Sequence, residues 1–166
     1  MENNEIEYDN QKALESGYYR SEHDRFPELC YAVDWREAHE LVKLIALQFG
    51  INFTVGYGRG SIEQPLEYAE NVGGFDWKKR KIYLLEFPLI IEIIHELAHC
   101  YTYLKFGTSK HDETLVKAVE EIVAFIRPQL KPANAEIQER RQKAVEESAH
   151  RLGLVPVKKT EKSKPK

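Results

Sequence analysis

Residues 88–106 read PLIIEIIHELAHCYTYLKF, and this stretch sets the centre of the fold. It combines good helix formers with aliphatic residues and has no internal proline or glycine. Pro88 suits the first turn of a helix, and Gly107 suits the position just past its end. The aliphatic residues before His95 cover most of the helix circumference, which predicts burial on nearly all sides. The sequence therefore predicts a buried helix over this range.

An H-E-x-x-H pattern, His95-Glu96-Leu97-Ala98-His99, lies in the middle of this predicted helix. Residues four apart lie on the same helix face, so both imidazoles can reach one metal ion. The pattern predicts a Zn²⁺ site in which Glu96 takes a proton from a bound water. Burying unpaired polar groups is costly, and a metal ion would offset that cost. The alternative is a pair of core histidines bonded to backbone carbonyls, with Glu96 as a cap or an ion-pair partner.

The length of 166 residues predicts one domain, and its two ends carry opposite charge. Residues 1–30 hold eight acidic against three basic side chains and show no periodicity, so we expect a flexible acidic arm or lid. Residues 31–153 form the expected folded domain. The last ten residues hold five lysines and one glutamate, so 154–166 is expected to be a disordered basic tail. Such a tail can also bind nucleic acid.

The chain lacks the features of a membrane or secreted protein. No run of 18 apolar residues occurs, and the N-terminus has no apolar segment typical of a signal peptide. Cys30 and Cys100 lie far apart and do not suggest a disulfide framework or a cysteine-based zinc site. These observations favour a cytoplasmic location.

Other patterns predict an α+β fold around the central helix. Asp34 suits the N-cap of an amphipathic helix that ends at Gly50. The expected elements are helices over 34–49, 113–126 and 134–152, a strand over 51–57, and a hairpin with strands 74–77 and 81–87. They predict an N-terminal helix, a short three-stranded antiparallel or mixed sheet, the H-E-x-x-H helix, a helix that carries a metal ligand, and a C-terminal helix.

A catalytic zinc site needs three protein ligands and an open position. Glu120 and Glu121 lie just off opposite edges of the apolar arc of the 113–126 helix, and either could turn toward the metal. His111, twelve residues after His99, is the other candidate. Each also has an ordinary surface role open to it, and periodicity does not choose among them.

Other groups could assist at such a site. Glu92, one turn before His95, is a candidate partner for a histidine ring nitrogen. Tyr101 or Tyr103 could hydrogen-bond an oxyanion, although packing in the core is the favoured role for both.

The order of elements resembles that of small zincin metallopeptidases. The segments GGFDWKKRKIYL and HELAH are similar to those of the ImmA/IrrE-like family. In that family a downstream E-A-N-x-F-A pattern carries the third ligand, and here EIVAFI begins at Glu121, with Ile122 and Val123 in place of Ala-Asn. Phe125 takes the aromatic position. This resemblance implies that Glu121 is the third ligand.

The SprT-like proteases are a second resemblance. Their third ligand is a histidine about a dozen residues after HELAH, in H-G-x-x-F/W. The segment KHDETL aligns His111 with that histidine, although Asp112 replaces the glycine and Leu115 the aromatic residue. This resemblance implies His111 as the ligand and DNA association through the basic tail. Of the two, Glu121 is preferred.

The resulting expectation is a zinc-dependent endopeptidase that acts on a peptide or protein substrate. Its metal ligands would be His95, His99 and Glu121, with His111 as the alternative third ligand and Glu96 as general base. A non-catalytic protein that uses the metal for structure or partner binding is the competing expectation.

Overall fold

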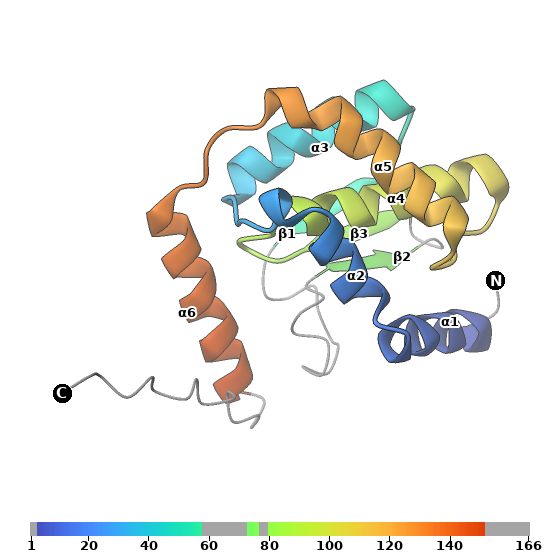
Figure 1. The fold of residues 1–166 in the computed structure, drawn as a ribbon, viewed down its shortest axis with the longest axis horizontal. Helices are drawn as coiled ribbons and strands as arrows, with labels where there is room; N and C mark the ends of the chain where they lie inside the picture. The colour runs from blue at the N-terminus through green and yellow to red at the C-terminus, as the bar shows by residue number, and fades with distance from the viewer. Residues whose placement is uncertain (1–2, 58–72, 77–79, 152–166) are drawn as a thin grey trace.

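The computed structural model describes residues 3–57, 73–76 and 80–151. Its helices are α1 (Asn3–Glu15), α2 (Tyr18–Arg25), α3 (Trp35–Phe49), α4 (Ile90–Phe106), α5 (Glu113–Ile126) and α6 (Ala135–Arg151). The strands are β1 (Thr54–Tyr57), β2 (Gly73–Asp76) and β3 (Lys81–Leu84), and short 3-10 turns cover Pro27–Leu29 and Arg127–Gln129. The expected α+β class is confirmed (Figure 1). The predicted basic tail lies outside the described residues.

The strands form one sheet in the order β1-β3-β2. β1 pairs in parallel with β3, with Thr54 opposite Lys81, and β2 pairs antiparallel to β3, with Gly73 opposite Leu84. The β2–β3 pairing is the hairpin expected from the sequence, whose turn includes residues outside the described part. The strands are shorter than expected: β1 begins at Thr54 rather than residue 51, and β3 ends at Leu84 rather than residue 87.

α4 is the buried centre of the fold, as its sequence predicts. Its residues from Ile90 to Cys100 are all buried, the two histidines and Glu96 among them. The helix packs against α5, α3 and the strands β2 and β3. Pro88 lies just before the N-cap residue Leu89 rather than in the first turn. α4 thus contacts both neighbouring helices and the sheet, and the H-E-x-x-H pattern lies in its middle.

The flanking helices begin and end at the residues that the sequence indicates. The Asp34 carboxylate accepts a hydrogen bond from the Glu37 N–H at 2.8 Å at the start of α3. Gly50 ends that helix with φ 67°, a conformation that favours glycine. At the start of α5, the Asp112 carboxylate accepts hydrogen bonds from the N–H groups of Thr114 and Leu115.

Polar side chains attach α6 to the rest of the chain. Gln138 accepts a hydrogen bond from the Ala32 N–H at 2.7 Å and donates one to the Ala32 carbonyl at 2.8 Å. Arg141 donates to the Phe87 carbonyl and to the buried carboxylate of Glu92, the latter at 2.6 Å. These contacts join the N-terminal half of α6 to the N-terminal end of α4 and the residues near it.

The N-terminal region differs from its prediction. Residues 1–30 were expected to be a flexible acidic arm or lid, but within this segment Asn3–Glu15 forms α1 and Tyr18–Arg25 forms α2, and the two helices contact each other (Figure 1). The buried positions of this charged segment form no recognisable sequence pattern, because Glu22 and Ala13 are buried while most of their neighbours are exposed. Among the described helices, none is both long and apolar enough to cross a membrane.

Candidate metal centre

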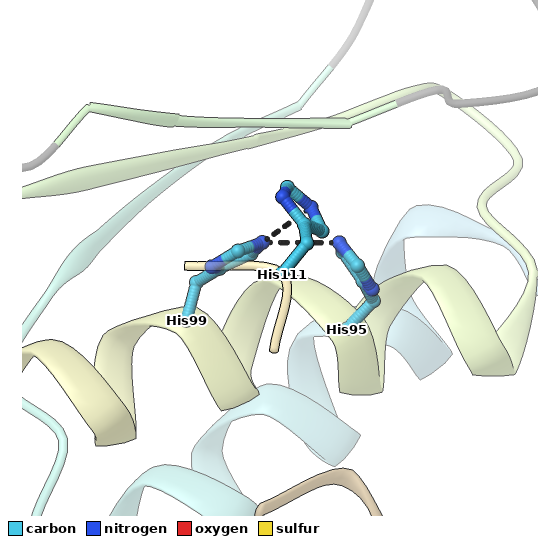
Figure 2. A group of neighbouring side chains, drawn as sticks. All are labelled: His95, His99 and His111. Carbon is cyan, nitrogen blue, oxygen red and sulfur yellow. Dashed lines mark hydrogen bonds between the residues drawn. The ribbon is translucent and has the colours of Figure 1, made fainter. Parts of the chain in front are cut away.

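Three histidines converge beside the middle of α4 (Figure 2). His95 and His99 project from α4, and His111 comes from the loop between α4 and α5 (Figure 2). The Nε2 atom of His99 lies 3.1 Å from Nε2 of His95 and 3.2 Å from Nε2 of His111. The three rings thus turn the same kind of atom toward one common point.

A short, well-defined loop brings His111 back over α4. Gly107 ends α4 with φ 71°, and its N–H donates to the Tyr103 carbonyl. Five residues later Asp112 caps α5, which packs closely on α4. His111 directly precedes that cap. Its position therefore follows from two helix ends and from the packing of two apolar faces.

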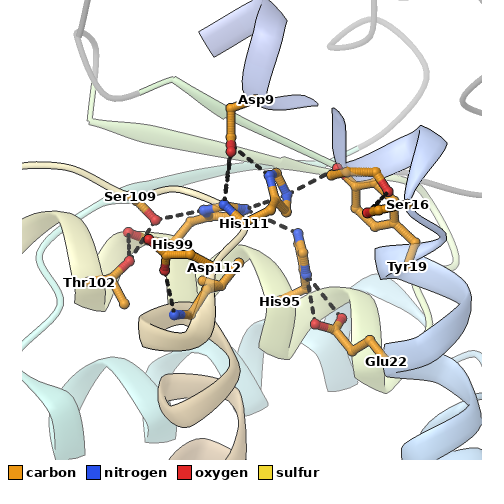
Figure 3. A network of polar contacts seen from close by, with 12 residues as sticks. Asp9, Ser16, Tyr19, Glu22, His95, His99, Thr102, Ser109, His111 and Asp112 are labelled. Carbon is orange, nitrogen blue, oxygen red and sulfur yellow. Dashed lines mark hydrogen bonds and ion pairs between the residues drawn. The ribbon is translucent and has the colours of Figure 1, made fainter. Parts of the chain in front are cut away.

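Each histidine uses its other ring nitrogen, Nδ1, for a contact that points away from the cluster (Figure 3). Nδ1 of His95 lies 2.9 and 3.1 Å from the two carboxylate oxygens of Glu22 on α2. Nδ1 of His111 lies 2.8 Å from a carboxylate oxygen of Asp9 on α1. Because an ionised carboxylate only accepts hydrogen bonds, each of these Nδ1 atoms carries the hydrogen.

The orientation of His99 follows from a chain of hydroxyl groups. The Thr102 hydroxyl donates to backbone carbonyls of α4, at 3.0 Å for Ala98, so its oxygen accepts the hydrogen of Ser109 at 2.6 Å. Ser109 Oγ is then the acceptor for Nδ1–H of His99 at 2.7 Å. All three rings can therefore keep Nε2 for a shared partner, as metal-binding histidines do.

The charges around the cluster favour a cation. Although burial opposes it, the Glu22 carboxylate raises the pKa of His95 to about 9. Burial, followed by the neighbouring imidazoles, lowers the pKa of His99, and burial also lowers the pKa of His111 against the effect of Asp9. A protonated His95 ring would donate a hydrogen bond from Nε2–H to Nε2 of His99. A metal ion would replace that proton and interact with all three lone pairs.

Glu96 is buried next to His95 in the sequence and is only 8% exposed. Burial raises the pKa of its carboxyl to about 7, partly opposed by His95. A carboxyl group with a pKa near 7 suits proton transfer at neutral pH.

Two tyrosines from α2 cover the histidines. The Tyr19 ring lies against His95 and His111, with centroid separations of 5.4 and 5.2 Å. Its hydroxyl is 3.0 Å from Nε2 of His111, to which it can donate, since Nδ1 of that ring carries the hydrogen. Tyr18 contacts the same two rings edge-on. Burial raises the pKa of Tyr19, which keeps its hydroxyl protonated in this arrangement.

Of the residues proposed from the sequence, the structure brings together His95, His99 and His111 but not Glu121. Glu121 is exposed on α5, because the apolar residues of that helix occupy the face toward α4. Glu120 is also exposed and pairs with Arg25 at 2.7 Å. The preference for Glu121 over His111 thus finds no support in the geometry.

Of two further expectations about site residues, the one for Glu92 differs from the structure and the one for Tyr101 agrees with it. Glu92 pairs with Arg141 of α6, and Glu22 is the carboxylate that contacts His95. Tyr101 packs on Phe49 with ring centroids 5.2 Å apart, in line with the packing role favoured from the sequence.

Sequence reasoning missed four residues of the site: Asp9, Tyr19, Glu22 and Ser109. Three of them belong to the segment expected to be a flexible arm. Its clustered tyrosines were the one available signal. No local pattern gives the contacts of α1 and α2 with the histidines, because the residues that meet lie about 70 to 100 positions apart.

Comparisons with known proteins add no family to this picture. No protein-family model matches the chain, and no curated protein or solved structure shows significant similarity to it. The geometry of the three histidines and their partners is therefore what indicates the function.

Proposed function

We propose that this protein is a zinc-dependent peptidase of the H-E-x-x-H type, in which His95, His99 and His111 hold the metal. The observation that carries the proposal is the convergence of three Nε2 atoms, with neighbouring pairs 3.1 and 3.2 Å apart. Zinc binds imidazole nitrogen at about 2.0–2.1 Å in tetrahedral geometry, which separates ligand atoms by roughly 3.4 Å. The donor set and its spacing fit Zn²⁺.

Bound zinc would supply a Lewis acid that polarises a peptide carbonyl and makes its bound water more acidic. The chain's own residues would do the rest. Glu22, Asp9 and Ser109 hold the rings with Nε2 facing inward. Glu96 would accept the proton of the attacking water and return it to the leaving amine.

The position of His111 favours the SprT-like pattern over the ImmA/IrrE-like one. In the former, the third ligand follows HELAH by about a dozen residues, and His111 is twelve residues after His99. In the latter, the ligand would be Glu121, which is exposed. A small zincin-like fold with a protein or peptide substrate is part of the same proposal.

The test compares wild type with Glu96→Gln, each loaded with one equivalent of Zn²⁺, on a panel of unfolded protein substrates. Glu96→Gln keeps the three histidines, so zinc binding should remain while hydrolysis falls by about 10²–10⁴-fold. The matched control is Glu121→Gln, an exposed glutamate that should leave hydrolysis unchanged. Hydrolysis that survives Glu96→Gln would contradict the mechanism. A zinc-loaded wild type that cleaves no substrate would favour a non-catalytic metal site.

A further inference from the structure

The three histidines are almost completely buried, and the N-terminal helices lie against them. The side chains of His95 and His111 are 7% and 4% exposed, and His99 is 6% exposed. In Figure 3, Asp9 of α1 and Tyr19 of α2 contact the cluster. A catalytic zinc site keeps one position open for water and substrate. With α1 and α2 in this place, a peptide has no access to a metal at the site.

α1 and α2 are attached to the rest of the fold mainly by polar side chains. Glu22 is the buried residue of α2, and its carboxylate binds Nδ1 of a histidine on α4 at 2.9 Å. Among the described side chains of α1, Ala13 is the buried one, and Asp9 binds His111. Tyr18 is half-buried against the core. A segment with so few buried apolar side chains opens at a lower free energy than the core does.

The chain is fixed to the core directly after α2. Phe26 and Leu29 follow the helix, and both are buried in the apolar core. Arg25, the last residue of α2, forms an ion pair with Glu120 of α5 at 2.7 Å, and both side chains are largely accessible to water. The two helices can therefore move as a unit about Phe26 while the core stays intact.

We propose that α1 and α2 (Asn3–Arg25) form an autoinhibitory cover, hinged at Phe26, that must move away before a peptide can reach the metal centre. This inference rests on the proposed peptidase function of that centre. The contacts that close the cover also orient the ligands, because Asp9 and Glu22 each bind Nδ1 of a histidine in the cluster. A metal therefore binds the closed form more tightly, and by reciprocity bound metal favours closure.

The experiment uses the full chain and reverses one charge outside the metal centre. Arg25→Glu places a carboxylate opposite Glu120 and should weaken the attachment of α2 to α5. The double variant Arg25→Glu, Glu120→Arg restores a pair of opposite charges. Arg127→Glu is the matched control, because it breaks an exposed ion pair with Glu28, which lies on the core side of the hinge.

Amide hydrogen exchange of the zinc-loaded chain measures the opening directly. Residues 3–25 should exchange faster than α4, through local opening, and removal of zinc should speed their exchange further. Exposed ion pairs are weak, so Arg25→Glu should raise the exchange rate of residues 3–25 by about two- to fivefold, and the double variant should restore it. Exchange as slow as that of α4, no response to zinc or to Arg25→Glu, or an equal acceleration in every helix would overturn the proposal.

Peptide hydrolysis by the same proteins tests whether opening admits substrate. Arg25→Glu should raise kcat/KM by the factor by which it raises the exchange of residues 3–25, while Arg127→Glu and the double variant should match wild type. An unchanged or lower kcat/KM in Arg25→Glu would overturn the autoinhibitory role. Hydrolysis absent from every variant would contradict the proposed function, and the exchange response to zinc and to Arg25→Glu would still decide whether the cover opens. The two failures are thus distinguishable.

Discussion

The carboxylate of Glu22 on α2 lies 2.9 Å from Nδ1 of His95 on α4, although the two residues are 73 positions apart. Both side chains are buried, with 4% and 7% of their surface exposed. The contact makes the N-terminal region a part of the candidate metal centre. It fixes the hydrogen of His95 on Nδ1 and leaves Nε2 facing His99 and His111.

Replacing Glu22 by glutamine should weaken metal binding. The amide oxygen can still accept the hydrogen of Nδ1, but the negative charge that favours a cation is lost. Partners of this kind typically contribute 10–100-fold to metal affinity, and we expect a loss of about 10-fold for this conservative change. Competition with a chelator measures it. Glu28→Gln is the control, because Glu28 forms an exposed ion pair with Arg127. Equal affinities for the two variants would contradict the role of Glu22.

Removal of the third ligand distinguishes His111 from Glu121. His111→Ala should reduce zinc affinity by more than the roughly 10–100-fold that an orienting partner contributes, because a direct ligand is lost. Glu121→Ala should retain one zinc per chain, since Glu121 is exposed on α5. Elemental analysis of the purified proteins after dialysis measures both. Loss of zinc in Glu121→Ala alone would restore the ligand set that the ImmA/IrrE resemblance implies.

The buried ion pair of Glu92 and Arg141 should control stability in a pH-dependent way. Burial raises the pKa of Glu92 to about 7, although Arg141, at 2.6 Å, lowers it. In Arg141→Met the folded-state pKa rises further, so above about pH 7 the fold must either keep the Glu92 carboxyl protonated or hold it charged without its partner. We expect a loss of about 3 kcal/mol in the free energy of unfolding near pH 9, where the wild-type carboxylate is ionised and paired.

The sign of this effect follows from proton linkage. A carboxyl group whose pKa is higher in the folded state binds more protons there, so the penalty grows as the pH rises above the unfolded value of 4.5. Both proteins share the unfolded value, so the difference between Arg141→Met and wild type comes from their folded-state pKa values. It should grow as the pH rises above about 7 and shrink as the pH falls through that value. Urea unfolding at several pH values measures it. The double variant Glu92→Leu, Arg141→Met should recover most of the loss, and Arg140→Met, in an exposed pair, should change little. A pH-independent loss would show that packing rather than charge is responsible.

Gly107 should matter through its backbone conformation alone. Its φ is 71°, and an added Cβ would meet no atom within 4 Å. Gly107→Ala should therefore cost about 1 kcal/mol of stability, because an L-residue pays for the left-handed conformation. Asparagine tolerates this conformation better, so Gly107→Asn should cost less. Thermal unfolding measures both. A loss of several kcal/mol in Gly107→Ala would mean that the loop to His111 has been displaced.

The local sequence determined the elements that carry the site. The ends of α3 and α5 follow from Asp34 and Asp112, whose carboxylates satisfy free N–H groups within three residues. The burial of α4 follows from the aliphatic residues that cover most of its circumference before His95, and the i, i+4 spacing places His95 and His99 on one face. The helix caps and the histidine spacing involve residues close in sequence, and the burial of α4 follows from its composition, so a local pattern contains all of them.

Only the tertiary structure shows that His111 joins His95 and His99 and which side chains contact the three histidines. The apolar face of α5 packs on α4 and thereby turns Glu121 outward, while the short loop returns His111 to the cluster. The charged N-terminal segment folds onto α4 through isolated buried residues, Glu22 above all, which carry no periodic signal. Contacts of this kind depend on how several helices pack together, and packing across about 70 to 100 positions is not encoded in any local pattern.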